Sequence, residues 1–450
     1  MLDSKSLVLL EKALKKMEGG FSMLPPVDVE YDIDALEKVI DSVAERMKDN
    51  YPYFHPYYAG QMLKPPHPVA RLAYMLSLWI NPNNHALDGG RASSAMEKEA
   101  VAGIARLFGW NDALGPLCSG GTMANLEALW VSGRLKPGMT VVASEQAHYT
   151  HGRISEVLGQ DFMAVECDGK ARMDVDALEK IIREKNVGTV VATIGTTGTG
   201  AVDPLPEILK LREKYGFRVH ADAAYGGYFI LADNITGAAR EAYNCLTGVD
   251  SIVIDPHKHG LQPYGCGCVL FKDPSVGTFY KHDSPYTYFS SSELHLGEIS
   301  LECSRPGASA VALWATQKLL PMIPGGEFAA GLAKSREAAL TMYEKLAHDT
   351  RFMTIIEPEL DIVIWAPKAE RVSDVSRLSK GIFEAAARRN LHLAIFNYPA
   401  KLLKNVWSDV AFDREQVTCL RSCLMKPEHR DWLERIWQIL DEAADEVVRK

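Results

Sequence analysis

The central part of the chain alternates between short apolar runs and amphipathic segments. The apolar runs are rich in β-branched side chains and are typical of buried strands, whereas several segments between them have the spacing of amphipathic helices. This alternation, over residues 114–271, predicts a mostly parallel sheet covered by helices on both faces. The expected strands are residues 141–143, 189–194, 217–221, 252–254 and 268–271.

The two ends of the chain have different patterns. Residues 2–17 and 32–47 carry apolar positions at helical spacing, which predicts two amphipathic helices that need a partner surface. We expect them to form an arm that packs on the body or on a second subunit. After a Pro-Gly-Gly break at residues 324–326, a long helix over 328–347 and further strands and helices predict a smaller α/β domain. The expected divisions are an arm with an aromatic loop over 1–65, a large domain over 66–322 and a small C-terminal domain over 323–450.

Composition and charge narrow the class of ligand. Of the 450 residues, 47% are hydrophobic and 24% are charged, as in ordinary globular proteins. The chain has 49 Lys and Arg against 58 Asp and Glu, a net charge of −9, without a basic run. This balance argues against nucleic acid or an anionic membrane as a partner and favours a small molecule. No apolar run is long enough for a transmembrane helix or a signal peptide, so we expect a cytoplasmic protein.

The eight cysteines are scattered along the chain. The pair Cys266-Gly-Cys268 lacks the spacing of a zinc site. We therefore expect reduced thiols and no metal.

Two polar residues that follow predicted strands indicate a cofactor. Lys258 comes shortly after the run 252–254, which Asp255-Pro256 ends, and Asp222 follows the strand 217–221. Strand ends of this kind are where α/β proteins bind ligands. Pyridoxal 5′-phosphate (PLP) needs a lysine that binds it covalently and an acid that keeps its ring nitrogen protonated. Each residue also has an ordinary interpretation, as a solvated surface amine and as a helix cap.

The turn Ser119-Gly-Gly-Thr122 lies between a short apolar strand and a predicted helix. Exposed backbone N–H groups, a hydroxyl and the positive end of a helix together favour a phosphate, although many such turns only cap a helix. Together with the other motifs, this turn assigns Gly121 and Thr122 to the phosphate of PLP. No G-x-G-x-x-G follows a strand, which disfavours a nicotinamide dehydrogenase.

Four motifs carry a resemblance to a known enzyme family. They are Cys118-Ser-Gly-Gly-Thr-Met-Ala-Asn125, His220-Ala-Asp-Ala-Ala-Tyr-Gly-Gly227, Ile254-Asp-Pro-His-Lys-His-Gly260 and Cys303-Ser-Arg-Pro-Gly-Ala308. These motifs resemble those of the group II PLP-dependent amino-acid decarboxylases, and most closely the archaeal tyrosine/aspartate decarboxylases, over about residues 55–440. The resemblance implies a fold-type I PLP enzyme and an obligate homodimer with active sites at the interface, which the N-terminal arm helps to build.

The resemblance also assigns residues around the cofactor ring. His148 follows the strand 141–143, and the residues alone leave His151, one helical turn later, as an equal choice. The resemblance selects His148 as the imidazole stacked on the ring, with Ala224 on the other side. His257 is a candidate to contact the phosphate or to move a proton, and it can equally cap the end of its strand.

Two further candidates lie in loops. Thr196 and Thr197 end a strand and can reach either the cofactor or Lys258, or they can be turn residues. Residues 281–297 have no periodicity and predict an irregular loop. The resemblance places the catalytic tyrosine of the family at Tyr286, on a loop contributed by the neighbouring subunit, and so favours Tyr286 over Tyr288.

Substrate candidates come from two places in the chain. Arg421 lies in an apolar stretch, where a guanidinium needs an anion. An internal salt bridge would meet that need, but the resemblance implies that Arg421 binds a substrate carboxylate. The aromatic and proline-rich loop over residues 51–60 either packs on the body or forms a pocket wall. The resemblance implies that this stretch contributes to the substrate pocket, which makes Tyr57 and Tyr58 candidates.

The combined expectation is α-decarboxylation of an L-amino acid to an amine and CO₂. The aromatic loop favours tyrosine or a similar substrate, and the resemblance keeps aspartate and glutamate open. The alternatives are a carbon–carbon lyase like sphingosine-phosphate lyase and an aminotransferase, since both use the same lysine and aspartate. An inactive regulatory relative would be expected to lack Lys258 or Asp222, and the chain has both.

Overall fold

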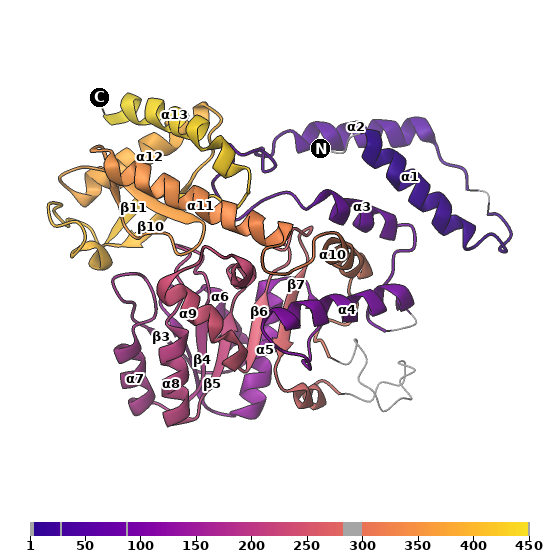
Figure 1. Ribbon diagram of the computed structural model, residues 1–450, viewed down its shortest axis with the longest axis horizontal. Coiled ribbons are helices and arrows are strands. Elements are labelled where there is room, and N and C mark those ends of the chain that lie inside the picture. Colours follow the sequence, from indigo (N-terminus) through magenta and orange to yellow (C-terminus); the bar gives the residue numbers. More distant parts are fainter. Residues whose placement is uncertain (1–3, 28, 87–88, 282–298, 449–450) are drawn as a thin grey trace.

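The apolar runs in the central region form a seven-stranded sheet with helices on both faces (Figure 1). The computed structural model describes residues 4–27, 29–86, 89–281 and 299–448. In the described chain, every residue of β2, β4, β6 and β7 is buried, which explains the continuous apolar runs. The strands are β1 (Leu117–Cys118), β2 (Thr140–Ser144), β3 (Phe162–Val165), β4 (Val187–Thr193), β5 (Arg218–Asp222), β6 (Ser251–Ile254) and β7 (Gly267–Phe271).

The strand order is β1-β7-β6-β5-β4-β2-β3, and the predicted mostly parallel sheet is confirmed. The exception is β7, which runs antiparallel to both β6 and β1. It reverses direction because residues 255–266, which connect it to β6, contain no crossover helix. The helices of this part are α4 (Arg91–Leu107), α5 (Gly121–Leu135), α6 (Thr150–Val157), α7 (Val175–Glu184), α8 (Leu205–Tyr215), α9 (Gly237–Asn244) and α10 (Gly307–Leu319).

The C-terminal part is built on a second, four-stranded sheet of order β10-β11-β9-β8, in which every pairing is antiparallel. Its core contains the fully buried Trp365. Figure 1 shows this sheet and its helices above the larger sheet. The elements are α11 (Glu327–His348), β8 (Phe352–Thr354), β9 (Ile362–Pro367), α12 (Val372–Arg388), β10 (Ala394–Pro399), β11 (Gln416–Cys423) and α13 (His429–Val448).

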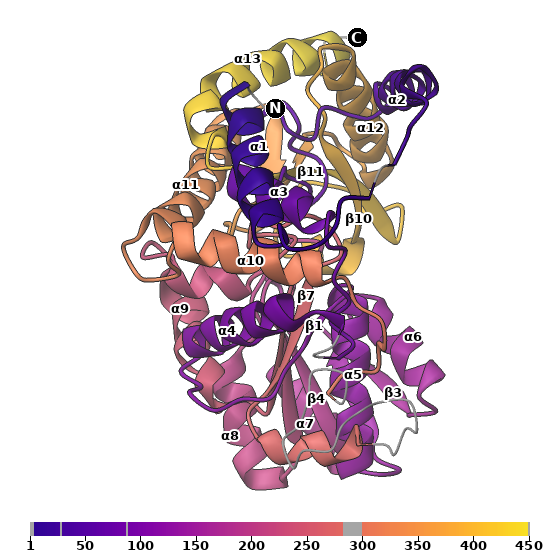
Figure 2. The ribbon, with the colours of Figure 1, turned by 90° about the vertical axis from the view of Figure 1, so that its right-hand side faces the viewer.

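The N-terminal helices are α1 (Ser4–Gly19), α2 (Ile33–Met47) and α3 (Pro68–Ser77). Helix α1 packs against α3, whereas α2 has no buried residue and extends away from the body (Figure 1, Figure 2). Its apolar side chains, which include Leu36, Val39 and Val43, are therefore exposed. The predicted helices are present, and α2 has no covering surface within the described chain.

The aromatic loop joins the N-terminal arm to the smaller sheet. The backbone N–H of Ala59 donates to the carbonyl of His392, and the N–H of Cys423 donates to the carbonyl of Ala59. The loop that the sequence groups with the arm is thus bonded to the C-terminal part of the fold.

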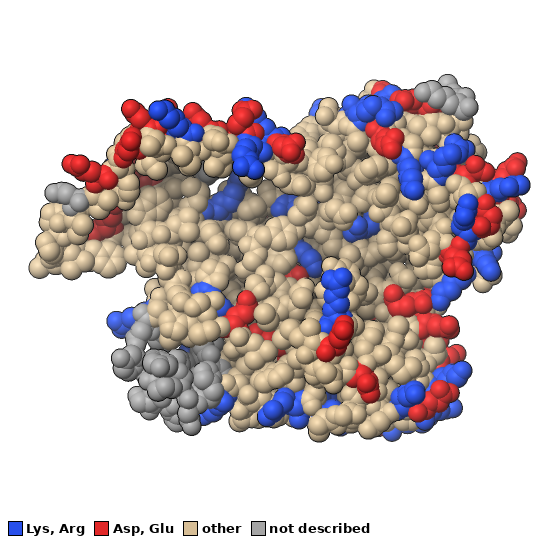
Figure 3. All heavy atoms as spheres, turned by 180° about the vertical axis from the view of Figure 1, so that it is seen from behind, with Lys and Arg blue, Asp and Glu red and all other residues tan. Residues whose placement is uncertain are grey.

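Lys and Arg are interspersed with Asp and Glu over the face in Figure 3. All eight cysteines are free. Among the residues described, no helix is long and apolar enough to cross a membrane.

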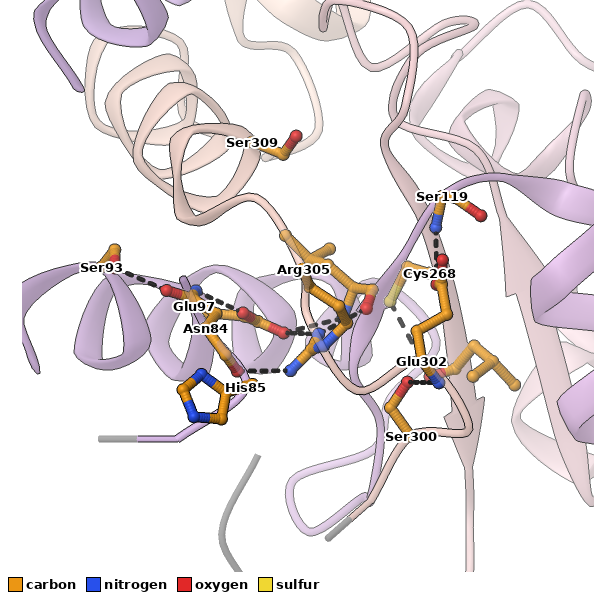
Figure 4. Close-up of polar contacts among 12 residues, drawn as sticks. Asn84, His85, Ser93, Glu97, Ser119, Cys268, Ser300, Glu302, Arg305 and Ser309 are labelled. Atoms are coloured by element: carbon orange, nitrogen blue, oxygen red, sulfur yellow. Dashed lines mark hydrogen bonds and ion pairs between the residues drawn. The ribbon is translucent and has the colours of Figure 1, made fainter. Parts of the chain in front are cut away.

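A buried ion pair fixes the beginning of β1 (Figure 4). Arg305 Nη1 lies 2.6 Å from Glu97 Oε1, and the two side chains are 4% and 2% exposed. The same Nη1 donates to the carbonyl of Leu117, whose N–H donates to Glu97. Asn84 adds a donor to Glu97 and a carbonyl acceptor for Arg305. The third residue of the Cys303-Ser-Arg motif therefore holds the strand that leads into the Ser119 turn.

We expect Arg305→Met to destabilise the fold by about 3–5 kcal/mol, because it leaves the Glu97 carboxylate buried without its cation. Urea denaturation measures the loss. The double variant Glu97→Gln/Arg305→Met removes both charges and should recover much of it. A double variant no more stable than Arg305→Met would show that the ion pair is not the cause.

Candidate active site

A cavity of about 330 Å³ opens at the carboxyl ends of the parallel strands. Its wall is formed by segments that follow five strands, β1, β2, β4, β5 and β6. The larger sheet thus brings together residues that are far apart in the sequence. The predicted site residues in this wall are Gly121, Thr122, His148, Asp222, Ala224, His257 and Lys258.

The amine of Lys258 lies in this cavity beside a carboxylate. Lys258 Nζ is 3.0 Å from Asp255 Oδ2, and His257 Nε2 is 3.5 Å from the same oxygen. Asp255 is buried, and its Oδ1 has no hydrogen-bond partner among the described residues. The sequence marks Asp255 only as the end of a strand, but the structure places its carboxylate in the cavity wall.

Asp222 ends β5 as a buried carboxylate. His151 Nε2 donates to Asp222 Oδ2 over 2.8 Å, Asn125 Nδ2 donates to the same oxygen over 3.4 Å, and the N–H of Ala224 donates to Oδ1 over 3.2 Å. Burial alone would raise the pKa of Asp222, but the hydrogen bond and charge of His151, with the charge of Lys258, bring it well below its usual range. The structure therefore keeps an ionised carboxylate inside the protein.

A layer of polar residues behind Asp222 supports this arrangement. His220 Nε2 donates to Asn125 Oδ1, and His220 Nδ1 lies 2.8 Å from the hydroxyl of Ser251. Burial lowers the pKa of His220 to about 3, so the imidazole is neutral and orients Asn125. Sequence reasoning missed His220 and Asn125. The available signal was the two-residue spacing of His220 and Asp222, which places both on one face of β5.

The turn before α5 contains two glycines at positions where a side chain would be strained or would fill the cavity. Gly120 has φ +153°, a conformation that other residues rarely adopt. A Cβ on Gly121 would lie 2.7 Å from Asp255 Oδ2. The first N–H groups of α5 have no partner within the helix, and the N–H of Ser119 donates to Glu302 Oε2 over 2.9 Å (Figure 4). This turn is a concave site with backbone donors for an anion.

Two histidines sit in the wall with stacked aromatic neighbours. His148 Nδ1 lies 2.7 Å from the hydroxyl of Thr150, and its ring stacks on Tyr149. His257 stacks on Tyr264. Burial lowers the pKa of both histidines, so both favour the neutral form. Between the two histidines that the sequence left open, the structure places His148 in the cavity wall and His151 on Asp222.

The neighbouring threonines have different positions. The Thr196 hydroxyl lies 2.8 Å from that of Thr199 within the turn after β4, and Thr196 is fully buried outside the cavity wall. Thr197 lines the cavity. The structure thus places Thr197 in the cavity wall and Thr196 behind it, and a cofactor contact of either residue stays a prediction.

Arg421 lies on β11, outside the cavity wall. Its Nη1 donates to Gln61 Oε1 over 3.0 Å, whereas its buried Nε and Nη2 have no partner among the described residues. Burial raises the pKa of the Tyr225 phenol, and the positive charge of Arg421 opposes this rise. Tyr225 lines the cavity. Arg421 therefore has unused donors next to the cavity, at the junction of the two parts of the fold.

The two candidate tyrosines of the aromatic loop pack on the C-terminal part. The ring of Tyr57 contacts Trp432 edge-on, and Tyr58 is buried with its hydroxyl accepting from the N–H of Gln61. Neither lines the cavity of the single chain, and their role in substrate binding stays a prediction. Tyr286 and Tyr288 lie outside the described residues.

Comparison with known proteins identifies the family. Residues 22–368 match the model described as the pyridoxal-dependent decarboxylase conserved domain. The chain belongs to this family. It is 32% identical to a probable L-tyrosine/L-aspartate decarboxylase of Methanothermobacter thermautotrophicus, over 68% of this chain and 81% of that protein. It is 28% identical to an L-tyrosine decarboxylase of Enterococcus faecium, over 77% and 74% of the two chains.

Solved structures show the same fold at low sequence identity. A structure of Oryza sativa TDC with PLP and tryptamine superposes with a TM-score of 0.78 and 15% identity, covering 98% of this chain and 96% of that one. Mouse CSAD in its apo form gives a TM-score of 0.76 and 19% identity, covering 95% and 92%. The fold-type I prediction is confirmed. The protein is a PLP-dependent carboxy-lyase.

The residues of the cavity fit PLP. Lys258 offers the amine that would hold it, the ionised Asp222 suits a protonated ring nitrogen, and the Gly120-Gly121 turn suits its phosphate. When bound, PLP accepts the electrons of a bond that breaks at the α-carbon of an amino acid. One cavity thus contains the amine of Lys258, the carboxylate of Asp222 and a glycine turn with backbone donors for a phosphate.

We expect Asp222→Asn to keep the fold and much of the cofactor while turnover falls by about 10³-fold, because an amide cannot stabilise the protonated ring nitrogen. Release of CO₂ from the preferred amino acid, measured beside the absorbance of bound PLP, checks this. The exposed Asp233→Asn serves as the control. Near-normal turnover in a folded, PLP-loaded Asp222→Asn enzyme would refute the role of Asp222.

Proposed function

We propose that this carboxy-lyase removes the α-carboxylate of an L-amino acid, with tyrosine as the first candidate and aspartate or glutamate as alternatives. Relatives named for both kinds of substrate support this choice, since an L-aspartate decarboxylase of Thermococcus kodakarensis is 32% identical over 63% of the chain. Tyrosine comes first because the aromatic loop over residues 51–60 leads directly to Gln61, the residue that contacts Arg421, and aromatic side chains there favour an aromatic substrate.

The observation that carries the proposal is the unpaired guanidinium of Arg421. It is 5% exposed and has two nitrogens without a partner in the described chain. A buried cation with free donors is costly unless an anion completes it. A planar guanidinium binds a carboxylate through paired hydrogen bonds. A substrate carboxylate entering beside Tyr225 would meet this requirement.

Each protein group then has a distinct task. Lys258 would hold PLP through its amine. Asp222, kept ionised by His151, would keep a proton on the ring nitrogen, and His148 and Ala224 would contact the ring from the cavity wall. Arg421 and Gln61 would bind the substrate carboxylate and so orient the substrate for loss of CO₂. Tyr286 supplies the proton that replaces the carboxylate.

The proposed unit is a homodimer. The apolar side chains of α2 are exposed along the whole helix, and a helix with an apolar stripe needs a surface to cover it. A second copy of the chain would cover it and would bring the Tyr286 loop to the neighbouring cavity.

We expect Arg421→Met to raise KM for the preferred substrate by about 100-fold, because a carboxylate loses a charge-assisted contact. A screen of amine and CO₂ release over the twenty amino acids identifies that substrate first. Exposed Arg414→Met is the control. If Arg421→Met keeps the wild-type KM, the carboxylate is bound elsewhere.

Replacing Tyr286 by Phe should lower the yield of amine by about 100-fold or more, because it removes the proton donor. Tyr288→Phe should leave the yield nearly unchanged. Mixing Tyr286→Phe subunits with Lys258→Ala subunits should restore amine formation, since one site of each mixed dimer is then intact. Loss of activity in Tyr288→Phe alone would show that the other tyrosine is the donor, and mixing without recovery would show that the loop acts within its own chain.

A further inference from the structure

A second cavity, of about 500 Å³, lies where the C-terminal part meets the larger sheet. We call it the junction cavity. Its wall comes from residues 64–71 before and within α3, the loop after Lys258, the beginning of α11 and the turn at residues 426–428. It shares no wall residue with the PLP cavity, but it contains His259, the neighbour of Lys258.

Cationic side chains predominate in the wall of the junction cavity. It holds four cationic residues and two glutamates, Glu327 and Glu428, so basic side chains outnumber acidic ones by two. The four cationic residues are Lys64, Arg71, Lys334 and Lys426.

Two of these ammonium groups are held by backbone carbonyls. Lys426, 3% exposed, donates to the carbonyl of Tyr58 over 2.7 Å. Lys64 donates to the carbonyl of Met425 over 3.2 Å. Within the described chain, neither forms an ion pair with a carboxylate. Because burial opposes their charge, the pKa of Lys64 falls to about 8 and that of Lys426 to about 7.

One further donor in the wall is unused. The buried Nε of Arg71 has no hydrogen-bond partner among the residues described. His259 also lines the cavity, but its Nε2 lies 3.2 Å from Asp361 Oδ2, so the neutral imidazole carries its proton towards Asp361 and offers no second donor. A buried donor without a partner is rare in native proteins and calls for a ligand or water. The Arg71 donor lines the same cavity as the two ammonium groups.

We propose that the junction cavity binds a small dianion, either a phosphate ester or a dicarboxylate. When Lys64 and Lys426 are protonated, the two negative charges match the excess of positive side chains in the wall, and a bound anion favours that protonated form. The volume of the cavity admits an organic group beside the charged ends. The anion would accept hydrogen bonds from Lys64, Lys426 and Arg71, and would join the segment before α3 to the turn before α13. This site is separate from substrate binding at Arg421.

The test uses the PLP-loaded enzyme after borohydride reduction, so that the phosphate cradle is filled and cannot bind the probe. The enzyme also carries Arg421→Met, which removes the other proposed anion site. Calorimetric titration with sulfate at neutral pH and low ionic strength should then show one site per chain. Lys64→Met and Lys426→Met should each weaken binding by about tenfold or more, because each removes one charged donor. Lys318→Met, on the exposed end of α10, should bind sulfate like the wild type.

Parallel titrations with inorganic phosphate and succinate distinguish the two ligand classes, because the preferred class binds more tightly than the other. Failure of all three anions to bind, or equal binding by the wild type and both lysine variants, would overturn the proposal. Methionine resembles lysine in length and lacks its buried charge, so the variants should fold, which thermal melting checks. If Lys426→Met does not fold, Arg71→Gln gives the same test from a partly exposed position.

Discussion

The active site depends on keeping the buried carboxylate of Asp222 ionised at the end of the larger sheet. Asp222 sits at the end of a strand whose neighbours are buried on both faces, where an isolated negative charge is costly. The structure offsets this cost with donors from three segments: His151 at the beginning of α6, Asn125 in α5 and the backbone of Ala224. The position of α5 and α6 against the sheet is thus part of the electrostatics of the cofactor, and a shift of either helix would change the charge state of Asp222.

The sequence predicts well those features that are carried by local pattern. The buried strands, Lys258, Asp222 and the glycine turn could be found because each follows from a run of neighbouring residues. The choice between His148 and His151 could not be made in this way. Both lie in one short segment, and only the packing of α6 on the sheet shows which imidazole reaches Asp222 and which reaches the cavity.

Long-range contacts set the limit of prediction from the sequence. Nothing near Arg421 in the chain indicates Gln61, which lies 360 residues away. Tyr57 and Tyr58 have the aromatic character of a pocket wall, but the carbonyl of Tyr57 accepts from the N–H of His392, just before β10, and the ring of Tyr57 packs on Trp432. Thr196 and Thr197 differ by one position, and the turn after β4 decides which one faces the cavity. In each case only the tertiary contacts show which of several similar residues faces the cavity.

The Arg305–Glu97 ion pair also has a consequence for the order of folding. The two residues are 208 positions apart, and together they support the strand that leads into the turn over residues 119–122. A contact of such sequence separation closes a long loop, which costs conformational entropy. During synthesis, the glycine turn is made early, but the buried Glu97 carboxylate has no cation until residue 305 has left the ribosome. The nascent chain therefore acquires its cofactor site only after nearly all of the larger sheet and its helices have been synthesised.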